Sequence, residues 1–266
     1  MVAGARSSLH GGVNQTLTPH DIAARIASVP HWYHRIEVAP GVFTPGITDS
    51  ATYRPFIVPF EDWHGTRVLD LGTRDGYWAF EFEKLGAEVV AVDYMPLEGT
   101  GFAVAADLLG SKVEYVQANL YDLRPEVHGT FDLVLFLGLL YHLPDPLGAI
   151  NRIRRLSRDR MVLETQSMDR AVLLADGSFA SLDQLAPALK DLPLMQFYPG
   201  DSLNNDFTNY WAPNLACLKG MLVESNFTVA RHEDHGSRVI VDARVADDPR
   251  KDHLMKAAYG EEAPGF

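Results

Sequence analysis

The sequence predicts an α/β fold: a mostly parallel, seven-stranded sheet with helices on both faces and a terminal antiparallel strand pair. Between residues 67 and 164, short apolar runs alternate with helix-like segments, which is the pattern of parallel strand-helix-strand units. The chain then closes with a helix-like segment and two strand-like runs joined by a turn at Gly236 and Ser237. Such a short connection favours an antiparallel pair.

A leader and a covering segment are expected before the sheet. Residues 1–18 are small, polar and glycine-bearing, and we expect them to form a mobile leader. Residues 19–62 begin with a helix capped by Thr18 or Asp21 and continue with a stretch rich in aromatic residues, histidine and proline. A second short helix is expected over 51–60. We expect the whole segment to act as an N-terminal helical lid.

Residues 67–93 form the unit around which the chain is organised. An apolar run stops at a turn, residues 72–76, with a glycine at each end, a helix-like segment follows, and a second apolar run ends on Asp93. In such units glycines let the backbone approach a ligand, and an acid after the second strand accepts hydrogen bonds from ribose hydroxyls. The unit predicts a site for a nucleoside-containing cofactor. Arg74 and Tyr77 stand where a dinucleotide site has glycines, which disfavours NAD.

The remaining core elements follow in alternation up to the last strands. We expect helices at 102–109 and 146–157, strands at 113–116, 131–137 and 160–164, a helix from Pro213, and strands at 227–231 and 239–245. The predicted organisation is a cofactor-binding core (63–165), an insertion that forms a lid over the acceptor site (166–212), a helix and strand pair that complete the core (213–246) and a tail (247–266). A long insertion in a compact domain usually has a function.

Composition narrows the classes of partner. The 266 residues are 47% hydrophobic and carry a net charge of −12, so no global basic field attracts nucleic acid. The single cysteine, Cys217, gives no disulfide framework and fits a reducing, cytoplasmic setting. No apolar run is long enough to span a membrane, and no spaced set of histidines and acids predicts a metal site. The oligomeric state is left open.

A resemblance to class I S-adenosylmethionine (SAM) methyltransferases over residues 50–245 is carried by LDLGTRDGYW, VVAVD, FLGLLYHLPDP, VLETQ and the closing helix and strands. It implies a Rossmann-like class I methyltransferase fold, a SAM-dependent methyltransferase activity and SAM as the cofactor. The run LGLLYHLPDPL followed by VLET is similar to the branch that includes the tRNA wobble-uridine carboxymethyltransferases and bacterial small-molecule methyltransferases. Arg74 replaces the middle glycine of the family's first motif, and it either turns outward or pairs with the cofactor's carboxylate.

The resemblance also implies the cofactor contacts. Asp70 and the two turn glycines would border the methionine half, Asp93 would hold the ribose hydroxyls, and Gly138 would lie by the sulfonium. Asn119 and Leu120 would flank the adenine. The predicted cofactor-binding residues are Asp70, Gly72, Thr73, Arg74, Gly76, Asp93, Tyr94, Asn119, Leu120 and Gly138.

Tyr141 and His142 follow the fourth strand, where donor and acceptor should meet. A histidine with a pKa near 6.5 suits deprotonation of a hydroxyl, and a structural contact to nearby backbone is the alternative for His142. His34 and His31 are rival bases if the N-terminal segment folds over the pocket. We therefore take His142, Tyr141 and His34 as the candidate catalytic residues.

Flat aromatic and amide side chains near the end of the insertion suit an acceptor pocket. Tyr198, Asn209 and Trp211 are the candidates, with Tyr210 beside them, and a hydrophobic plug that pins the loop is the alternative. Arg238 completes the predicted substrate-binding set. Five arginines at positions 152, 154, 155, 158 and 160 are expected to form a solvated helix end rather than a nucleic-acid surface.

The predicted function is methyl transfer from SAM to an oxygen or nitrogen of a small-molecule acceptor. Carboxymethyltransferases of the resembling branch bind carboxy-SAM through an upstream lysine, the tyrosine of the LYH run and a late arginine. Tyr141 and Arg238 match, but no lysine occurs before Lys84, so plain SAM is favoured. The alternatives are carboxymethyl transfer to the wobble uridine of tRNA and a non-catalytic binding module.

Overall fold

The computed structural model describes residues 17–60 and 62–251. The chain divides into two compact units, Met1–Leu120 and Tyr121–Phe266, and each is described by itself. Of the predicted leader and tail, residues 1–16 and 252–266 lie outside the described residues.

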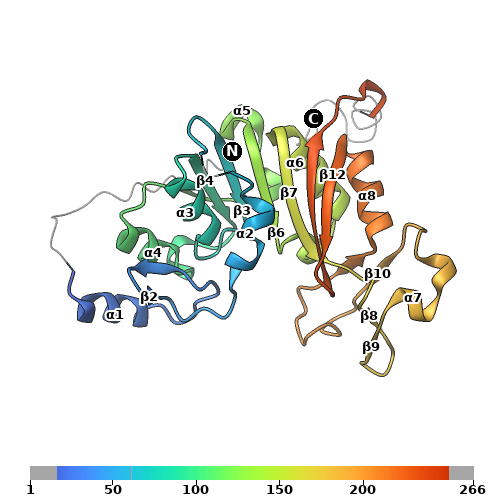
Figure 1. Ribbon diagram of the computed structural model, residues 1–266, viewed down its shortest axis with the longest axis horizontal. Helices are drawn as coiled ribbons and strands as arrows, with labels where there is room; N and C mark the ends of the chain where they lie inside the picture. The colour runs from blue at the N-terminus through green and yellow to red at the C-terminus, as the bar shows by residue number, and fades with distance from the viewer. Residues whose placement is uncertain (1–16, 61, 252–266) are drawn as a thin grey trace. The chain divides into compact units, whose positions relative to one another are not determined.

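The first unit begins with short elements that precede the sheet. Helix α1 (Pro19–Ala27) starts at Thr18, whose side chain accepts a hydrogen bond from the Asp21 backbone while the Asp21 carboxylate accepts one from Thr18. This reciprocal cap confirms the predicted start. The following elements are β1 (Glu37–Ala39), β2 (Val42–Phe43), a 3-10 turn (Ser50–Tyr53) and α2 (Arg54–Ile57). In Figure 1, α1, β1 and β2 gather beside α4 of the same unit.

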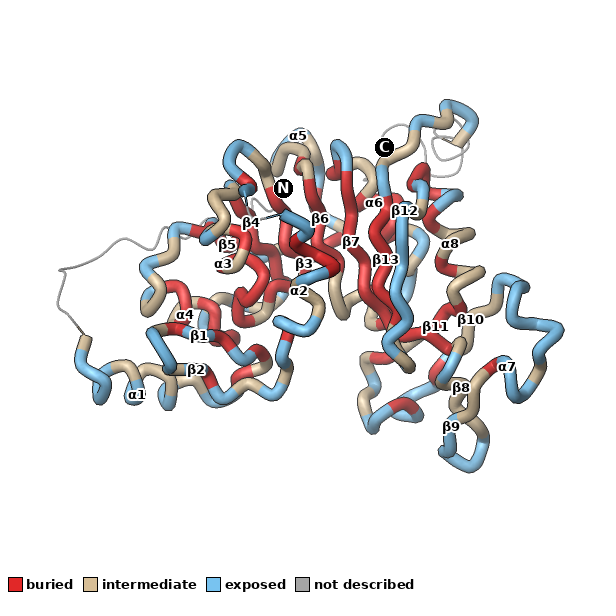
Figure 2. Tube along the Cα trace, viewed as in Figure 1, coloured by how far each residue is buried: buried red, intermediate tan, exposed pale blue. Residues whose placement is uncertain are grey.

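Three parallel strands form the sheet of the first unit. They are β3 (Arg67–Leu71), β4 (Glu88–Asp93) and β5 (Glu114–Gln117), separated by α3 (Tyr77–Lys84) and α4 (Phe102–Leu109). The register places Leu71 beside Val92 and Asp93 beside Gln117, so the carboxyl ends of the three strands lie at one edge. Buried residues along β3 and β4 anchor that edge (Figure 2).

The second unit carries four strands in the order β12-β13-β7-β6. Its elements are α5 (Pro125–His128), β6 (Phe131–Leu137), α6 (Pro146–Leu156), β7 (Ser157–Gln166), α8 (Leu215–Glu224), β12 (Phe227–Asp234) and β13 (Arg238–Val245). β6 and β7 are parallel, whereas β13 is antiparallel to both β7 and β12. The seven strands of the mostly parallel sheet are therefore present, and the predicted fold class is confirmed.

The insertion between β7 and α8 has small elements and a core of its own. They are β8 (Val172–Leu173), β9 (Phe179–Ala180), α7 (Leu182–Leu185), a 3-10 turn (Pro187–Leu189), β10 (Met195–Phe197) and β11 (Trp211–Pro213). They lie together beyond one end of β7 and β13 (Figure 2). Their buried cluster comprises Met168, Leu182, Tyr198, Leu203 and Ala212.

The helix expected from Pro213 begins two residues later, and this part of the prediction is wrong. Pro213 ends β11, paired with Met195. Asn214 is the cap of α8 because its side chain accepts a hydrogen bond from the Cys217 backbone at 2.9 Å. An asparagine cap outweighs the preference of proline for a first helical turn.

The arginine-rich stretch, residues 152–160, is not the solvated helix end that the sequence predicts. Arg160 lies on β7, is 3% exposed and pairs with Asp242 at 2.9 Å. Arg152 is 5% exposed, and Arg154 donates to the backbone carbonyls of Asn226 and Ala246. Arginine stems and guanidinium groups here hold the elements of the second unit together.

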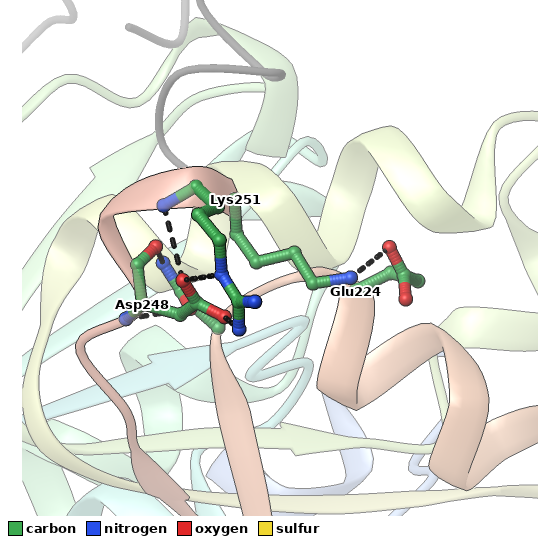
Figure 3. Close-up of polar contacts among 5 residues, drawn as sticks. Glu224, Asp248 and Lys251 are labelled. Carbon is green, nitrogen blue, oxygen red and sulfur yellow. Dashed lines mark hydrogen bonds and ion pairs between the residues drawn. The ribbon is translucent and has the colours of Figure 1, made fainter.

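The last described turn is fixed to α8. Asp248 accepts hydrogen bonds from Arg250, and the Lys251 ammonium pairs with Glu224 (Figure 3). Among the described residues, we find no helix of the length and apolar character that a bilayer crossing needs.

Candidate functional site

The glycine turn of the first unit folds over the end of β4. The backbone N–H groups of Gly72 and Thr73 both donate to the Val92 carbonyl, at 2.8 and 3.1 Å. Gly72 and Gly76 have φ of 71° and 92°, in the left-handed region that favours glycine. At Gly76 a Cβ would lie 2.5 Å from the Phe80 ring and 2.7 Å from Phe102. Backbone conformation and packing therefore both require this glycine.

Asp93 ties the turn to the chain beyond β4. One carboxylate oxygen accepts from the Arg74 N–H at 2.9 Å and the other from the Met95 N–H at 3.0 Å. The Ala118 N–H donates to the Asp93 carbonyl at 2.9 Å, which brings the start of the segment with Asn119 and Leu120 to the same edge. The predicted ribose and adenine positions are thus neighbours in one unit.

Arg74 occupies the left-handed region, with φ of 50°. Its guanidinium lies 3.7 Å from the Met95 sulfur and 5.7 Å from the centre of the Tyr33 ring. The side chain therefore runs toward the predicted nucleoside end of the turn. Tyr94, by contrast, is 70% exposed. Their contacts with a cofactor stay predictions.

Asp70 lies beneath the turn and is fully buried. Its carboxylate accepts a hydrogen bond from the Thr73 hydroxyl at 2.7 Å. Burial raises the pKa of Asp70 to about 6, and the negative charge of Asp93 acts in the same direction. The carboxyl group thus fixes the turn from inside, together with Thr73.

Asp75 was not among the predicted site residues, although it joins three segments of the first unit. Its carboxylate accepts hydrogen bonds from the backbone N–H groups of Tyr33 (2.6 Å), His34 (2.9 Å) and Gly101 (2.9 Å). No sequence motif signals this role because the donors are backbone groups. The bond to His34 fixes the N-terminal segment to the turn.

His34 and His31 differ in environment. His31 is exposed, whereas His34 is 8% exposed and packs edge-on against Tyr33. Burial lowers the pKa of His34 to about 4. Of the two rival bases in this segment, only His34 is held inside the first unit.

In the second unit, Tyr141, Glu164 and Arg238 form a charged cluster at the end of β6. One Arg238 nitrogen lies 3.2 Å from each Glu164 carboxylate oxygen, and another donates to the Tyr141 hydroxyl at 3.1 Å. Burial raises the pKa of Glu164, and Arg238 opposes that rise. Gly138 has φ of 66°, and a Cβ there would lie 3.7 Å from Glu164. The structure thus brings together three predicted residues and adds Glu164.

His142 is held by the insertion. Its Nδ1 lies 3.1 Å from the Thr208 carbonyl oxygen and 2.9 Å from the Thr208 hydroxyl oxygen, and that hydroxyl donates to Asp206 at 2.6 Å. The carbonyl can only accept, so the proton belongs on Nδ1 and Nε2 carries the lone pair. Burial lowers the pKa of His142, so the ring is neutral at pH 7.

The remaining predicted acceptor residues lie in or beside the insertion core. Tyr198 is 3% exposed, and burial raises its pKa to about 12. The Asn209 amide donates to the Leu203 carbonyl at 3.0 Å. Trp211 packs against Phe197, and its buried indole N–H has no hydrogen-bond partner among residues 17–60 and 62–251. Tyr198 and Asn209 stabilise the insertion, and acceptor contacts by all three stay predictions.

The first core strand of this α/β fold ends in a glycine turn, and the next strand ends on an acid. This combination is typical of proteins that bind a nucleoside-containing cofactor. Residues 45–210 match the family model described as a methyltransferase domain. That match covers more than half of the chain, so the chain belongs to the methyltransferase-domain family, and the predicted family is confirmed.

Curated relatives include the ubiquinone biosynthesis O-methyltransferase of Xanthomonas oryzae pv. oryzae (strain PXO99A), 34% identical over 41% of this chain and 46% of the relative. The tRNA U34 carboxymethyltransferase of Actinobacillus succinogenes is 26% identical over 73% of this chain and 54% of that protein. The chain thus spans about half the length of these relatives.

Solved structures share the fold. The N-terminal domain of EvdMO1 with S-adenosylhomocysteine (SAH) bound has a TM-score of 0.59 at 18% identity, covering 87% of this chain and 98% of that one. The 1,6-didemethyltoxoflavin-N1-methyltransferase of Burkholderia thailandensis has a TM-score of 0.52 at 19% identity, covering 92% and 96%.

Proposed function

We propose that the protein transfers a methyl group from SAM to an oxygen or nitrogen of a small-molecule acceptor, with a hydroxyl as the favoured acceptor group. The orientation of His142 carries this proposal. A neutral imidazole whose Nδ1 proton is held by Thr208 presents Nε2 as a base. Methyl transfer to a hydroxyl needs such a base, because the oxygen loses its proton as it attacks.

The first unit fits the donor. The left-handed glycines at both ends of the turn let backbone approach a ligand closely, and Asp93 lies where ribose hydroxyls would be held. Asn119 and Leu120 would flank the adenine, with Arg74 along the nucleoside. SAM supplies an electrophilic methyl group on a sulfonium. The names of both solved neighbours mention SAH, the product that SAM leaves after methyl transfer, and support the same donor.

Tyr141 and Arg238 are proposed to orient the acceptor or the transferring group. Glu164 compensates much of the Arg238 charge, since both of its carboxylate oxygens lie 3.2 Å from the same nitrogen. A second carboxylate would have to compete with Glu164 for that guanidinium. The pair therefore supports plain SAM over carboxy-SAM, as does the net charge of −12, which disfavours a tRNA acceptor. The cytoplasmic location stays a prediction.

Carboxymethyl transfer to the tRNA wobble uridine is the second candidate. The resemblance of 26% over 198 residues to a tRNA U34 carboxymethyltransferase favours it, as does the hydrogen bond between Arg238 and the Tyr141 hydroxyl. Thermal unfolding with SAM, with carboxy-SAM and with neither distinguishes the donors, because a ligand that binds only the folded state raises the midpoint. A higher unfolding temperature with carboxy-SAM than with SAM would overturn the first proposal. No change with either would favour a non-catalytic module.

The base is tested by His142→Gln. We expect kcat for a hydroxyl acceptor to fall about 10²- to 10⁴-fold, with unchanged SAH affinity. The exposed His232 gives the matched control, His232→Gln. In the unmodified protein, kcat should rise with pH through the lowered pKa of His142 and then level off, because only the neutral ring accepts a proton. A rate that falls as pH rises through this range would contradict the assignment.

A further inference from the structure

Thr208 presents two oxygens to the ring of His142, and only one of them has a fixed hydrogen-bonding role of its own. The Nδ1 atom lies 3.1 Å from the Thr208 carbonyl oxygen and 2.9 Å from the hydroxyl oxygen. The carbonyl can only accept a hydrogen bond, whereas a free hydroxyl can turn to accept or to donate. The direction of the hydroxyl therefore decides whether Nδ1 meets two acceptors or one acceptor and one donor.

Asp206 sets the direction of that hydroxyl. Its Oδ1 accepts from the Thr208 hydroxyl at 2.6 Å and from the Thr208 backbone N–H at 2.9 Å. These two hydrogen bonds lower the pKa of Asp206, so the carboxylate is ionised at pH 7 and cannot donate in return. A hydroxyl has one proton, and because this proton points to Asp206, only a lone pair faces Nδ1. Both Thr208 oxygens then accept from a proton on Nδ1.

Closing the turn of Asp206 does not require the bond from the hydroxyl. The backbone bond from the Thr208 N–H to the Asp206 carboxylate already forms a turn of the kind that aspartate favours. The hydroxyl bond adds a connection from that carboxylate to a ring 66 residues away in the sequence. Asp206 is therefore linked to His142 through one side-chain oxygen.

The turn that carries Asp206 is held by the core of the insertion. The Asp206 N–H donates to the Leu203 carbonyl at 3.1 Å, and the Asn209 side chain donates to the same carbonyl at 3.0 Å. Leu203 belongs to the buried cluster of the insertion. Asp206 is thus fixed in position from within the insertion, without any contribution from a ligand.

The segment after Thr208 is attached to the chain beside His142. The Tyr210 N–H donates to the Tyr141 carbonyl at 2.8 Å, and the Tyr141 and His142 rings have their centres 4.1 Å apart. The carboxylate, the hydroxyl and the imidazole are therefore aligned before an acceptor binds, which is the preorganisation that a catalytic base requires.

We propose that Asp206 is a positioning residue that acts through the Thr208 hydroxyl to keep the proton of the neutral His142 ring on Nδ1. The inference rests on the proposed function, in which His142 is the base for a hydroxyl acceptor. His142 receives the acceptor's proton at Nε2 while the acceptor oxygen bonds to the methyl carbon, whose bonding pair to sulfur stays with the departing thioether. Asp206 then also stabilises the positive charge that the ring acquires.

Nitrogen NMR of the histidine rings tests the proposal without an acceptor, because the two ring nitrogens differ in shift according to which one carries the proton. His142→Gln identifies the signals. In the unmodified protein, we expect the neutral ring to be in the form protonated at Nδ1. Asp206→Ala frees the hydroxyl to donate to Nδ1, so the ratio of the Nδ1–H form to the Nε2–H form should fall about 3- to 10-fold.

Two further variants separate positioning from support of the loop. Asp206→Asn keeps an oxygen that accepts from Thr208, so it should leave the ratio unchanged. Burial lowers the pKa of His142, the charge of Asp206 opposes this effect, and that of Arg238 adds to it. The Asp206→Asn ring should therefore titrate at a lower pH than the unmodified one. In a Thr208→Val background, Asp206→Ala should not alter the ratio, because the hydroxyl through which it acts is missing.

Asp201→Ala is the matched control, since Asp201 is an exposed acid of the same segment. It should change neither the ratio nor the titration. An unmodified ring protonated at Nε2, or an unchanged ratio in Asp206→Ala, would overturn the inference. A fall of the ratio in the Thr208→Val background would overturn it too, because Asp206 would then act through the loop. Failure of the unmodified protein to bind SAH by calorimetry would instead refute the proposed function, so the two failures are distinguishable.

Discussion

Asp70→Asn is expected to stabilise the protein at neutral pH. Asp70 is buried, and its carboxylate accepts hydrogen bonds from the Thr73 hydroxyl and the Ala79 backbone. Its pKa is about 6 in the folded chain against 3.8 for the unperturbed group. At about 1.4 kcal/mol for each tenfold change in an equilibrium constant, this difference corresponds to about 3 kcal/mol.

The sign follows from the raised pKa. Below pH 3.8 the carboxyl is protonated in both states and costs nothing. Between pH 3.8 and about 6 the unfolded chain loses the proton more readily than the folded chain, so the folded state loses stability as pH rises. Above about pH 6 the loss is complete. The neutral asparagine avoids it and can still accept from Thr73.

Urea unfolding of both proteins at several pH values from 4 to 8 measures the effect. The free energy of unfolding of the variant minus that of the unmodified protein should increase by up to about 3 kcal/mol between pH 4 and pH 6.5 and then stay constant. Asp183→Asn, at an exposed position in α7, is the control. A difference that does not change with pH would show that Asp70 titrates normally and that its burial has been misjudged.

Two further substitutions test the site. Left-handed backbone alone should cost an alanine about 1–2 kcal/mol. Gly76→Ala should reduce the free energy of unfolding by more than this, because its Cβ would meet Phe80. Gly110→Ala, with φ of 63° and open space around it, should show only the backbone cost in the same urea assay. Arg238→Ala should cost about 3–5 kcal/mol at pH 7, because Glu164 is then left buried without its cation. The loss should shrink toward low pH as Glu164 takes up a proton, whereas Arg170→Ala, which breaks an exposed pair, should change stability by less than about 1 kcal/mol. Equal losses in either matched pair would contradict these explanations.

The sequence was sufficient for most elements because their signals are local. Helix α4 and strand β6 have the predicted bounds, 102–109 and 131–137, since continuous apolar runs between turn residues leave little choice. Thr18 and Asp21 form the predicted helix start because a cap is also a local signal, set by residues only three positions apart. The start of α8 was misplaced because Pro213 and Asn214 are both helix-start signals, and only tertiary contacts select between them.

The site could be predicted only where its chemistry follows a motif. The turn with Gly72, Gly76 and Asp93 is such a case: both glycines have left-handed backbone and Asp93 accepts from the Arg74 N–H, while the cofactor contacts of these residues stay predictions. Asp75 and Glu164 were missed because each acts on groups distant in sequence, backbone amides 41 and 42 residues away for Asp75 and a guanidinium 74 residues away for Glu164. The burial of Arg152 and Arg160 was missed for the same reason, since charge runs are usually exposed.

Asn214 joins the insertion to the start of α8. Its buried side chain accepts from the Leu194 and Cys217 amides and donates to the Lys190 and Leu192 carbonyls. These bonds join residues 190–194 of the insertion to the start of α8. The two ends of the insertion are joined by the Met168 N–H, which donates to the Pro213 carbonyl, and by the Leu215 N–H, which donates to the Asp169 carboxylate. Between them the insertion packs around its own apolar cluster. Its outer surface can change during evolution without repacking the sheet, so chains with the same donor-binding half can diverge in the molecules that they modify.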